Sequence, residues 1–334
     1  MRLISNFTAT LLLMFQCVAY AGNDDAFDSE RLGAFILDME RKHGFSRAEL
    51  QRLFDEATLQ PSILQAIAKP AESKPWYQYR NIFLTRDRID GGLAFWQANA
   101  AKLEEASRRF GVEPEIIVAI IGVETAYGRN TGKYRVIDAL ATLGFNYPKR
   151  ATFFRKELEN YLLLARSQHF DPLVLTGSYA GAMGLPQFMP SSYRSYAVDF
   201  DDDTTIDIWN NPTDAIGSVG NYLREHGWLT GAPITVSARV SGSGYQSLLG
   251  TGVKPRIPVS EMRDLGVEAA APVDGDPKAA LVELQAEYAM EYWLGFNNFY
   301  VITRYNTSPL YAMAVYQLAQ ALRDAHVAVA SVSQ

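Results

Sequence analysis

A glutamate in the segment VEPEIIVAIIGVETAYGRN stands where it could act as a general acid. Glu124 follows isoleucines at distances of seven, four and three residues, so its carboxyl group shares a helix face with them. We expect the side chain to be at least partly buried, and burial raises the pKa of a carboxyl group toward the range that suits a proton donor. The alternative is a buried structural glutamate paired with an arginine such as Arg129 or Arg135, which is the commoner case for this pattern alone.

The run SYAGAMGLPQFMPSSY, Ser178 to Tyr193, combines small residues with a few polar ones. It has no Gly-Lys-Ser/Thr ending and no GxGxxG spacing after a strand, which argues against a phosphate site. Glycines let a backbone approach a ligand closely, Ser178 offers a hydroxyl, and Gln187 offers a bidentate amide, which together are the parts of a sugar cleft. A tight helix–helix crossing built on small residues is the alternative.

The segment VDFDDDTTIDIWNNPTD is rich in aspartate and contains no basic residue. Acids at relative positions 1, 3 and 5 match the start of an EF-hand loop. Thr204 stands where that loop has glycine, and Asn210 stands where it has glutamate. The segment is therefore either a calcium loop or a solvated acidic loop that caps the helix expected to begin near Asp214. The aspartates are Asp199, Asp201, Asp202, Asp203, Asp207 and Asp214.

Helical patterning must position most of these residues. Ser29 opens one helix that closes at Gly44, and Ser46 with Glu49 forms a capping box for the next. The spacing predicts further helices at about 86–110, 114–127, 150–167, 213–226 and 309–326, the last with Ser308 as its cap and Pro309 in its first turn. Alternation predicts strands at ITVSARV (234–240), AALVEL (279–284) and FYVITRY (299–305), which we interpret as a small antiparallel sheet.

The chain begins with MRLISNFTATLLLMFQCVAYAGNDD, which is typical of an export signal cleaved after Ala21. Its apolar run is too short to span a membrane, so we expect a soluble, exported protein. Cys17 is the sole cysteine, and a lipid anchor there is not favoured because no small residue directly precedes it. Cleavage would leave no disulfide or thiol nucleophile. The net charge of −6 argues against nucleic-acid binding, which normally needs a basic surface.

Four motifs, in this order, resemble the lytic murein transglycosylase B family, glycoside hydrolase family 103. They are GVETAYGRNTGKYRVIDALATLGFNYPKR, GSYAGAMGLPQFMPSSY, DAIGSVGNYLREHGW and FYVITRYNTSPLYAMAVYQLA. The resemblance covers most of the mature chain. It implies a mainly α (α+β) fold with a lysozyme-like helical core, an additional helical domain and a small inserted antiparallel β domain. The expected parts are a signal peptide (1–21), an N-terminal helical domain (22–84), the catalytic core (85–231), the β-rich domain (232–305) and a C-terminal helix (306–334).

The resemblance further implies cleavage of the β-1,4 bond between N-acetylmuramic acid and N-acetylglucosamine in peptidoglycan, with a 1,6-anhydromuramyl end as product. Glu124 would be the single acid and base, and no cofactor would be required. One carboxylate suffices because the muramyl acetamido group supplies the second function, whereas most glycosidases use a carboxylate pair. The alternatives are a hydrolytic muramidase, or a noncatalytic peptidoglycan-binding protein.

The family pattern also assigns residues to the cleft. Ser178 would hydrogen-bond near the glutamate or the substrate acetamido group. The other cleft residues implied are Gln187, Phe188, Tyr222, Tyr305, Asn306, Tyr311, Tyr79 and Arg150. The calcium ligands implied are Asp199, Asp201, Asp203, Thr205 and Asp214. The expected partners are peptidoglycan glycan strands in the periplasm.

Overall fold

The computed structural model describes residues 26–68 and 74–332. The expected signal peptide, its cleavage site at Ala21 and Cys17 lie outside the described residues. Within these ranges, no helix is both long and apolar enough to cross a membrane.

Helices make up most of the described chain. They are α1 (Ser29–His43), α2 (Arg47–Glu56), α3 (Pro61–Ala66), α4 (Trp76–Tyr79), α5 (Arg86–Ala98), α6 (Ala100–Phe110), α7 (Pro114–Thr125), α8 (Val136–Asn146), α9 (Ala151–Gln168), α10 (Pro190–Tyr196), α11 (Pro212–Glu225), α12 (Val259–Asp264), α13 (Asn297–Tyr305) and α14 (Pro309–Val332). The prediction of a mainly α fold with a small antiparallel sheet is confirmed.

The expected helix ends follow from local hydrogen bonding. The Ser46 hydroxyl accepts from Glu49 N (3.4 Å), and the Ser308 hydroxyl accepts from Tyr311 N (3.4 Å). Gly44 ends α1 with a φ of 65°, a left-handed conformation that glycine adopts without a Cβ penalty. These caps satisfy backbone groups that the helix itself leaves unpaired.

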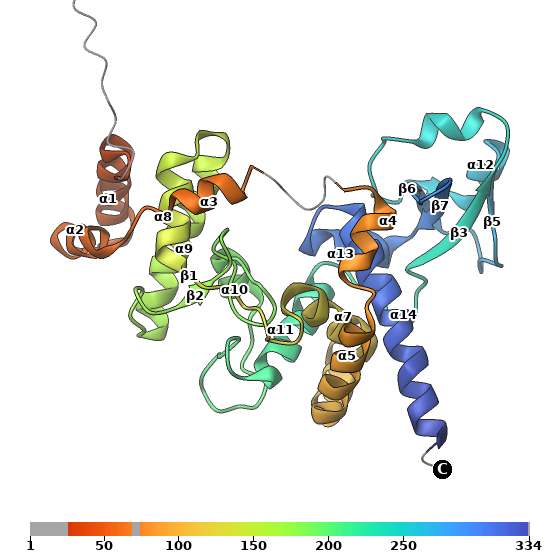
Figure 1. Ribbon diagram of the computed structural model, residues 1–334, viewed down its shortest axis with the longest axis horizontal. Helices are drawn as coiled ribbons and strands as arrows, with labels where there is room; N and C mark the ends of the chain where they lie inside the picture. The colour runs from red at the N-terminus through yellow and green to blue at the C-terminus, as the bar shows by residue number, and fades with distance from the viewer. Residues whose placement is uncertain (1–25, 69–73, 333–334) are drawn as a thin grey trace, which may run out of the picture.

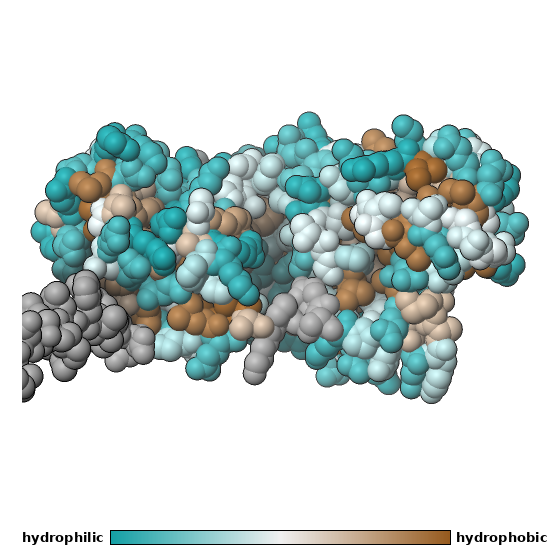
Figure 2. Space-filling view, turned by 90° about the horizontal axis from the view of Figure 1, so that it is seen from above, coloured by the Kyte–Doolittle hydropathy of each residue, from teal (hydrophilic) through white to brown (hydrophobic). Residues whose placement is uncertain are grey.

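The helices form two groups that share one continuous apolar core. Helices α1, α2 and α3 lie beside α8 and α9, while α5, α7 and α14 pack together toward the other end (Figure 1). The central α7 is almost wholly buried between Ile116 and Val123, so its end is fixed by packing on several sides. Figure 2 shows the surface hollowed between two lobes.

The β-rich part holds a five-stranded antiparallel sheet in the order β4-β6-β7-β3-β5. Its strands are β3 (Thr235–Val240), β4 (Ile257–Pro258), β5 (Val267–Ala269), β6 (Lys278–Gln285) and β7 (Met290–Gly295). One face of this sheet covers a separate apolar cluster around Met262 and Leu294, and the other face meets the main core through Val282 and Leu284. A further antiparallel pair, β1 (Tyr134–Arg135) with β2 (Thr176–Gly177), links the two segments that flank the Glu124 cavity described below.

Two expectations for secondary structure are wrong. The helix expected over 86–110 is broken into α5 and α6 at Asn99, where φ is −120° and ψ is 20°. The segment 299–305, expected as a strand, belongs to α13. Its β-branched and aromatic residues favour a strand by composition, but Phe299 and Ile302 are buried at the three-residue spacing of a helix. The domain boundaries stay a prediction.

Candidate active site

Glu124 lies in the last turn of α7 and is half-buried, so the expected partial burial is confirmed. Its carboxylate lines a cavity of about 490 Å³. The cavity is bounded by the segment 129–134 on one side and by Ser178, Tyr179 and Gln187 on the other. The structure thus places the acid expected from the helix pattern beside two polar residues of the small-residue run.

The chain turns sharply directly after α7. Ala126, Tyr127 and Gly128 have φ values of 52°, 63° and 87°, three successive left-handed residues. Ala126 and Tyr127 rarely adopt this conformation, so packing must hold them in it. The Tyr127 hydroxyl donates to the backbone oxygen of Arg88 (2.9 Å), and the Arg88 guanidinium donates to the backbone oxygen of Gly122. The turn brings residues 129–134 back over the carboxylate.

Thr125 ties the end of α7 to the small-residue run. Its hydroxyl accepts from Gly128 N (3.0 Å) and lies at donating distance from the backbone oxygen of Leu185 (3.0 Å). Thr125 is fully buried, so these contacts are shielded from water. The loop that carries Gln187 is thereby held in place relative to Glu124.

The small-residue run folds as a close-packed loop, so the alternative of a helix–helix crossing is wrong. Short antiparallel bridges connect Gly177 with Met183 and Met183 with Phe188. Gly184 has a φ of 66°, and a Cβ there would lie 2.4 Å from the backbone oxygen of Ile208. Only glycine fits this approach, which explains why the run is rich in small residues.

Ser178 and Gln187 present different chemistry to the cavity. The Ser178 hydroxyl accepts from Ala182 N (3.0 Å), which leaves its hydrogen available as a donor. The Gln187 side-chain amide nitrogen donates to the backbone oxygens of Thr131 (3.1 Å) and Gly184 (3.0 Å). The nitrogen of the amide that was expected to be bidentate is therefore engaged by the backbone, and Gln187 offers the cavity its carbonyl oxygen as an acceptor.

Buried tyrosines stand behind the carboxylate. The Tyr311 hydroxyl donates to Glu124 Oε1 (2.6 Å), and the Tyr305 hydroxyl donates to the backbone oxygen of Pro186 (2.7 Å). Burial raises the pKa of both phenols well above the usual value, and the nearby charge of Glu124 raises each pKa further. Both tyrosines therefore stay protonated, and Tyr311 remains a hydrogen-bond donor.

The remaining predicted cleft residues do not line this cavity. Phe188 and Tyr222 pack against the Tyr305 ring, and the Tyr222 hydroxyl donates to the backbone oxygen of Arg304 (2.5 Å). Tyr79, on α4, is close enough to Tyr311 to raise the pKa of that phenol. Asn306 accepts from Ser308 N (3.1 Å) at the start of α14. Arg150 is exposed, with its guanidinium over the ring of Phe153 (4.4 Å).

The two arginines considered as structural partners of Glu124 have other contacts. Arg135 forms an ion pair with Asp138 (2.8 Å), and Arg129 Nε donates to the backbone oxygen of Ala126 (3.1 Å). Arg129 also lines the cavity, together with Lys133, which the sequence argument did not single out. Lys133 belongs to the same GVETAYGRNTGKY segment as Glu124, and that closeness in the sequence was the signal that could have identified it.

The acidic loop gathers part of the predicted calcium set. Asp199, Asp201 and Asp214 place carboxylate oxygens within 4.8 Å of one another. Asp214 is fully buried and accepts from Phe200 N (2.8 Å) and Asp207 N (2.7 Å), while burial raises its pKa. A hard cation prefers such a set of carboxylate oxygens, and these three residues fit one.

Two details of this loop bear on the expected EF-hand pattern. Thr204 has a φ of 75°, so the chain makes the sharp turn even though glycine is absent. Asp203 does not belong to the cluster of three, and its carboxylate instead accepts from Thr205 N (2.7 Å). The structure therefore brings together three of the predicted ligands and leaves the side chain of Asp203 in a local turn.

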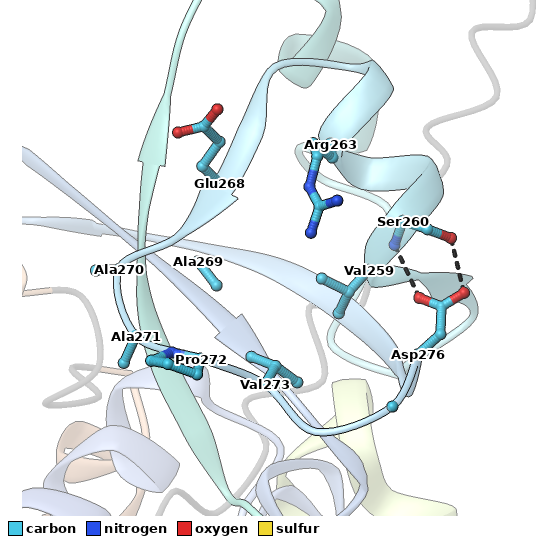
Figure 3. A pocket seen from close by; sticks show the side chains of 11 residues that line it. Val259, Ser260, Arg263, Glu268, Ala269, Ala270, Ala271, Pro272, Val273 and Asp276 are labelled. Carbon is cyan, nitrogen blue, oxygen red and sulfur yellow. Dashed lines mark hydrogen bonds between the residues drawn. The ribbon is translucent and has the colours of Figure 1, made fainter.

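A separate pocket of about 590 Å³ lies on the β-rich part, between α12 and the segment after β5 (Figure 3). The Arg263 side chain reaches into it from α12, as Figure 3 shows. Asp276 accepts from both the backbone nitrogen (2.8 Å) and the hydroxyl (2.7 Å) of Ser260. None of the predicted site residues lines this pocket.

Comparison with known proteins identifies the family and its relatives. Residues 28–320 match the family described as the transglycosylase SLT domain. The membrane-bound lytic murein transglycosylase B of Escherichia coli is 46% identical over 303 residues, which is 88% of this chain and 82% of that protein.

Solved structures agree with this match. The soluble lytic transglycosylase SltB1 of Pseudomonas aeruginosa is 52% identical with a TM-score of 0.83, over 88% of this chain and 99% of that one. The Escherichia coli lytic transglycosylase Slt35, solved in complex with calcium, is 46% identical with a TM-score of 0.82, over 89% and 94% of the two chains.

Proposed function

The chain belongs to the transglycosylase SLT domain family and is a lytic transglycosylase that cleaves peptidoglycan, and we propose that Glu124 is its single catalytic acid and base. The bond cleaved is the β-1,4 bond between N-acetylmuramic acid and N-acetylglucosamine, and the product carries a 1,6-anhydromuramyl end. The observation that carries this proposal is the half-buried Glu124 carboxylate in a cavity, held by the Tyr311 hydroxyl at 2.6 Å.

The reaction needs two proton transfers at one face of the muramyl ring. Protonated Glu124 first donates to the departing glycosidic oxygen while the muramyl acetamido carbonyl supports the positive charge that develops at C1. The resulting carboxylate then removes the proton of the C6 hydroxyl, whose oxygen forms the bond to C1. Both protons pass through the same group, so a second protein carboxylate is not needed.

Ser178 and Gln187 are suited to hold the acetamido group during these steps. The free hydroxyl hydrogen of Ser178 can donate to a carbonyl oxygen, and the free carbonyl of Gln187 can accept from an amide N–H. Because the Gln187 nitrogen is fixed on Thr131 and Gly184, its oxygen is oriented before substrate arrives. This preorganisation supports cleavage because no reorganisation is needed at the moment of reaction.

Whether water is excluded from the site decides between a lytic transglycosylase and a hydrolytic muramidase. If water reached C1 before the C6 hydroxyl, the product would be a reducing muramic end, as in a hydrolytic muramidase. The apolar surroundings of α7 and the buried tyrosines behind Glu124 limit water on the protein side of the carboxylate. This favours the anhydro product over the hydrolytic one.

We assign a structural calcium ion to Asp199, Asp201 and Asp214, with Asp203 and Thr205 of the same loop as further ligands in the family pattern. The ion would neutralise carboxylates that otherwise repel one another beside the start of α11. The proposal draws support from the calcium complex of the Slt35 relative. No cofactor enters the proposed reaction itself.

We place the enzyme in the periplasm, where peptidoglycan glycan strands are accessible, after removal of residues 1–21. Six further residues are proposed to contact or support successive sugars in the cleft. They are Phe188, Tyr222, Tyr305, Asn306, Tyr79 and Arg150. Phe188, Tyr222 and Tyr79 would give this support through packing, since all three are buried.

Product analysis tests the function directly. Purified sacculi treated with the mature protein should release muropeptides whose muramyl ends lack a reducing group and weigh one water less than the hydrolytic product. Mass spectrometry before and after borohydride reduction distinguishes the two, because only reducing ends gain two hydrogens. Reducing muramic ends would overturn the transglycosylase reaction in favour of a muramidase.

A further inference from the structure

A third cavity, of about 780 Å³, lies between α4 and the turn that joins β6 to β7. Figure 1 shows α4 beside these strands. Trp76, Tyr77 and Arg80 line it from the helix side, and Tyr288 and Glu291 line it from the hairpin side. The cavity is thus built by two segments far apart in the sequence.

Arg80 is a half-buried cation with an aromatic support. Its guanidinium lies over the Trp76 ring at 5.7 Å, and it forms no ion pair or side-chain hydrogen bond with the residues described. A stacked guanidinium keeps its planar set of donors free, and that set matches the two oxygens of a carboxylate. Arg80 is therefore suited to bind an anion that enters the cavity.

Glu291 supplies the opposite charge. It is half-buried at the start of β7 and shares a strand face with Trp293, whose ring packs against the main core. Like Arg80, it has no ion pair within the described ranges. The cavity therefore holds Arg80 and Glu291, which do not neutralise each other, and a second carboxylate, Glu287, which accepts from the Tyr288 hydroxyl (3.0 Å). In the pocket of Figure 3, by contrast, the carboxylate of Asp276 is already bound by Ser260.

Aromatic side chains complete the cavity. Tyr288 is 92% exposed at the hairpin turn, which Ala286 N closes on the backbone oxygen of Ala289 (3.0 Å). Trp76 is only 1% exposed, and its indole nitrogen is buried without a hydrogen-bond partner among the described residues. Buried donors without acceptors are rare in native proteins, so the unpaired indole nitrogen calls for an explanation, and Tyr288 offers an exposed aromatic ring at the same cavity.

The cavity is connected to the catalytic carboxylate through α4 itself. Trp76 of α4 and Arg80 directly after this helix line the cavity, whereas Tyr79 at the end of α4 lies near Tyr311, which binds Glu124. The Trp76 and Tyr79 rings are 6.5 Å apart. A ligand in the cavity would therefore sit within reach of a substituent on a sugar held at Glu124.

We propose that this cavity binds the peptide stem of the glycan strand, with a stem carboxylate on Arg80 and a stem ammonium group at Glu291. Murein stems carry free carboxylates and the amino group of a diamino acid, so their charges are complementary to this pair. The Tyr77 and Tyr288 rings would cover the peptide backbone. The inference rests on the proposed function, because the stem reaches the cavity only on a strand bound for cleavage.

Comparing two substrates separates the contribution of the peptide stem from that of the glycan strand. One is intact sacculi, and the other is glycan strands stripped of peptides by an amidase. Arg80→Gln and Glu291→Gln should each lower kcat/KM on intact sacculi by about tenfold, the loss expected for one charge-assisted hydrogen bond, and leave kcat/KM on bare strands within about twofold of wild type. Arg80→Lys should recover part of the loss, because it keeps the charge but not the planar donor set.

Arg86→Gln is the matched control, since its side chain is 92% exposed and pairs only loosely with Asp90 (3.5 Å). It should behave as wild type on both substrates, and melting temperatures of all variants should be compared. Wild-type protein inactive on both substrates would contradict the proposed function. Active wild type with variants that are unchanged, or that lose equal activity on both substrates, would overturn the stem site alone.

Discussion

The Tyr311 hydroxyl donates a 2.6 Å hydrogen bond to Glu124 Oε1, and the two residues are 187 positions apart in the chain. The bond fixes one carboxylate oxygen in place and so orients the group that would exchange protons with a substrate. Tyr311 is 3% exposed and its pKa is raised by burial, so it cannot act as a base in place of Glu124. The tyrosine therefore positions the carboxylate.

Removing this hydroxyl tests the positioning role. Tyr311→Phe keeps the ring in its packing and deletes the donor. We expect kcat to fall by about tenfold, the effect of one hydrogen bond to a charged group. The alkaline limb of the pH–rate profile, where Glu124 loses the proton that it must donate, should move to higher pH, because the carboxylate form loses its stabilising partner. A purely structural tyrosine would change the melting temperature without moving the profile.

Glu124→Gln should abolish turnover while the protein stays folded. The amide has the shape of the carboxyl group, and its oxygen can still accept from Tyr311, but it cannot donate or remove a proton. We expect a loss of at least about 10²-fold to 10⁴-fold, the usual contribution of a general acid or base. Release of muropeptides is measured by chromatography and stability by thermal melting. Full activity in this variant would rule out Glu124 as the catalytic group, and a noncatalytic binding protein would show no wild-type turnover to lose.

The sequence predicted the helix face of Glu124 because isoleucines recur at helical spacing, and it predicted the Ser46 and Ser308 caps because capping is local. It could not predict the turn after α7. The Tyr127 ring packs over Gly122, and its hydroxyl donates to the backbone oxygen of Arg88, 39 positions earlier in the chain, and these contacts hold the turn at positive φ. Local propensity carries no information about such distant packing.

The incorrect prediction of a strand at 299–305 also has its cause in tertiary packing. Phe299 and Val301 favour a strand by type, but the segment must fill the space beside α14, and tertiary packing selected the helix. The contact between Tyr311 and Glu124 was likewise beyond any spacing argument, since it joins two distant helices. The family resemblance placed both residues in one cleft, while their hydrogen bond emerged only from the fold.

Gln187→Glu tests the orientation of the amide. A carboxylate at this position would face the backbone oxygens of Thr131 and Gly184, which now accept from the amide nitrogen. The loss of both hydrogen bonds and the repulsion should destabilise the protein by about 1–3 kcal/mol, measured by urea unfolding. Gln187→Asn has the amide but a shorter side chain and should lose activity with a smaller change in stability. Wild-type stability in Gln187→Glu would mean that the amide is placed the other way round.

Calcium should raise the melting temperature if the acidic loop holds the ion. Asp201→Asn removes one charge from the three-carboxylate cluster at an exposed position, so it should fold normally and lose most of the calcium response. Asp202→Asn is the control, because Asp202 is exposed and outside the cluster. Calorimetry with calcium or a chelator measures both. An unchanged wild-type transition would identify the run as a solvated loop.

Glu115 should make the stability of the folded protein depend on pH, independently of catalysis. It lies in the first turn of α7 with its side chain 13% exposed, and burial raises its pKa above the ordinary 4.5 despite Arg323 at 3.9 Å. The folded state therefore holds this proton more tightly than the unfolded chain, so stability is lost as pH rises from 4.5 through the folded pKa. Glu115→Gln should raise the melting temperature near pH 7.5 and leave it unchanged near pH 4, whereas Glu104→Gln, at an exposed site, should have little effect at either pH. A lower melting temperature of Glu115→Gln at neutral pH would show that the attraction to Arg323 outweighs the cost of burial.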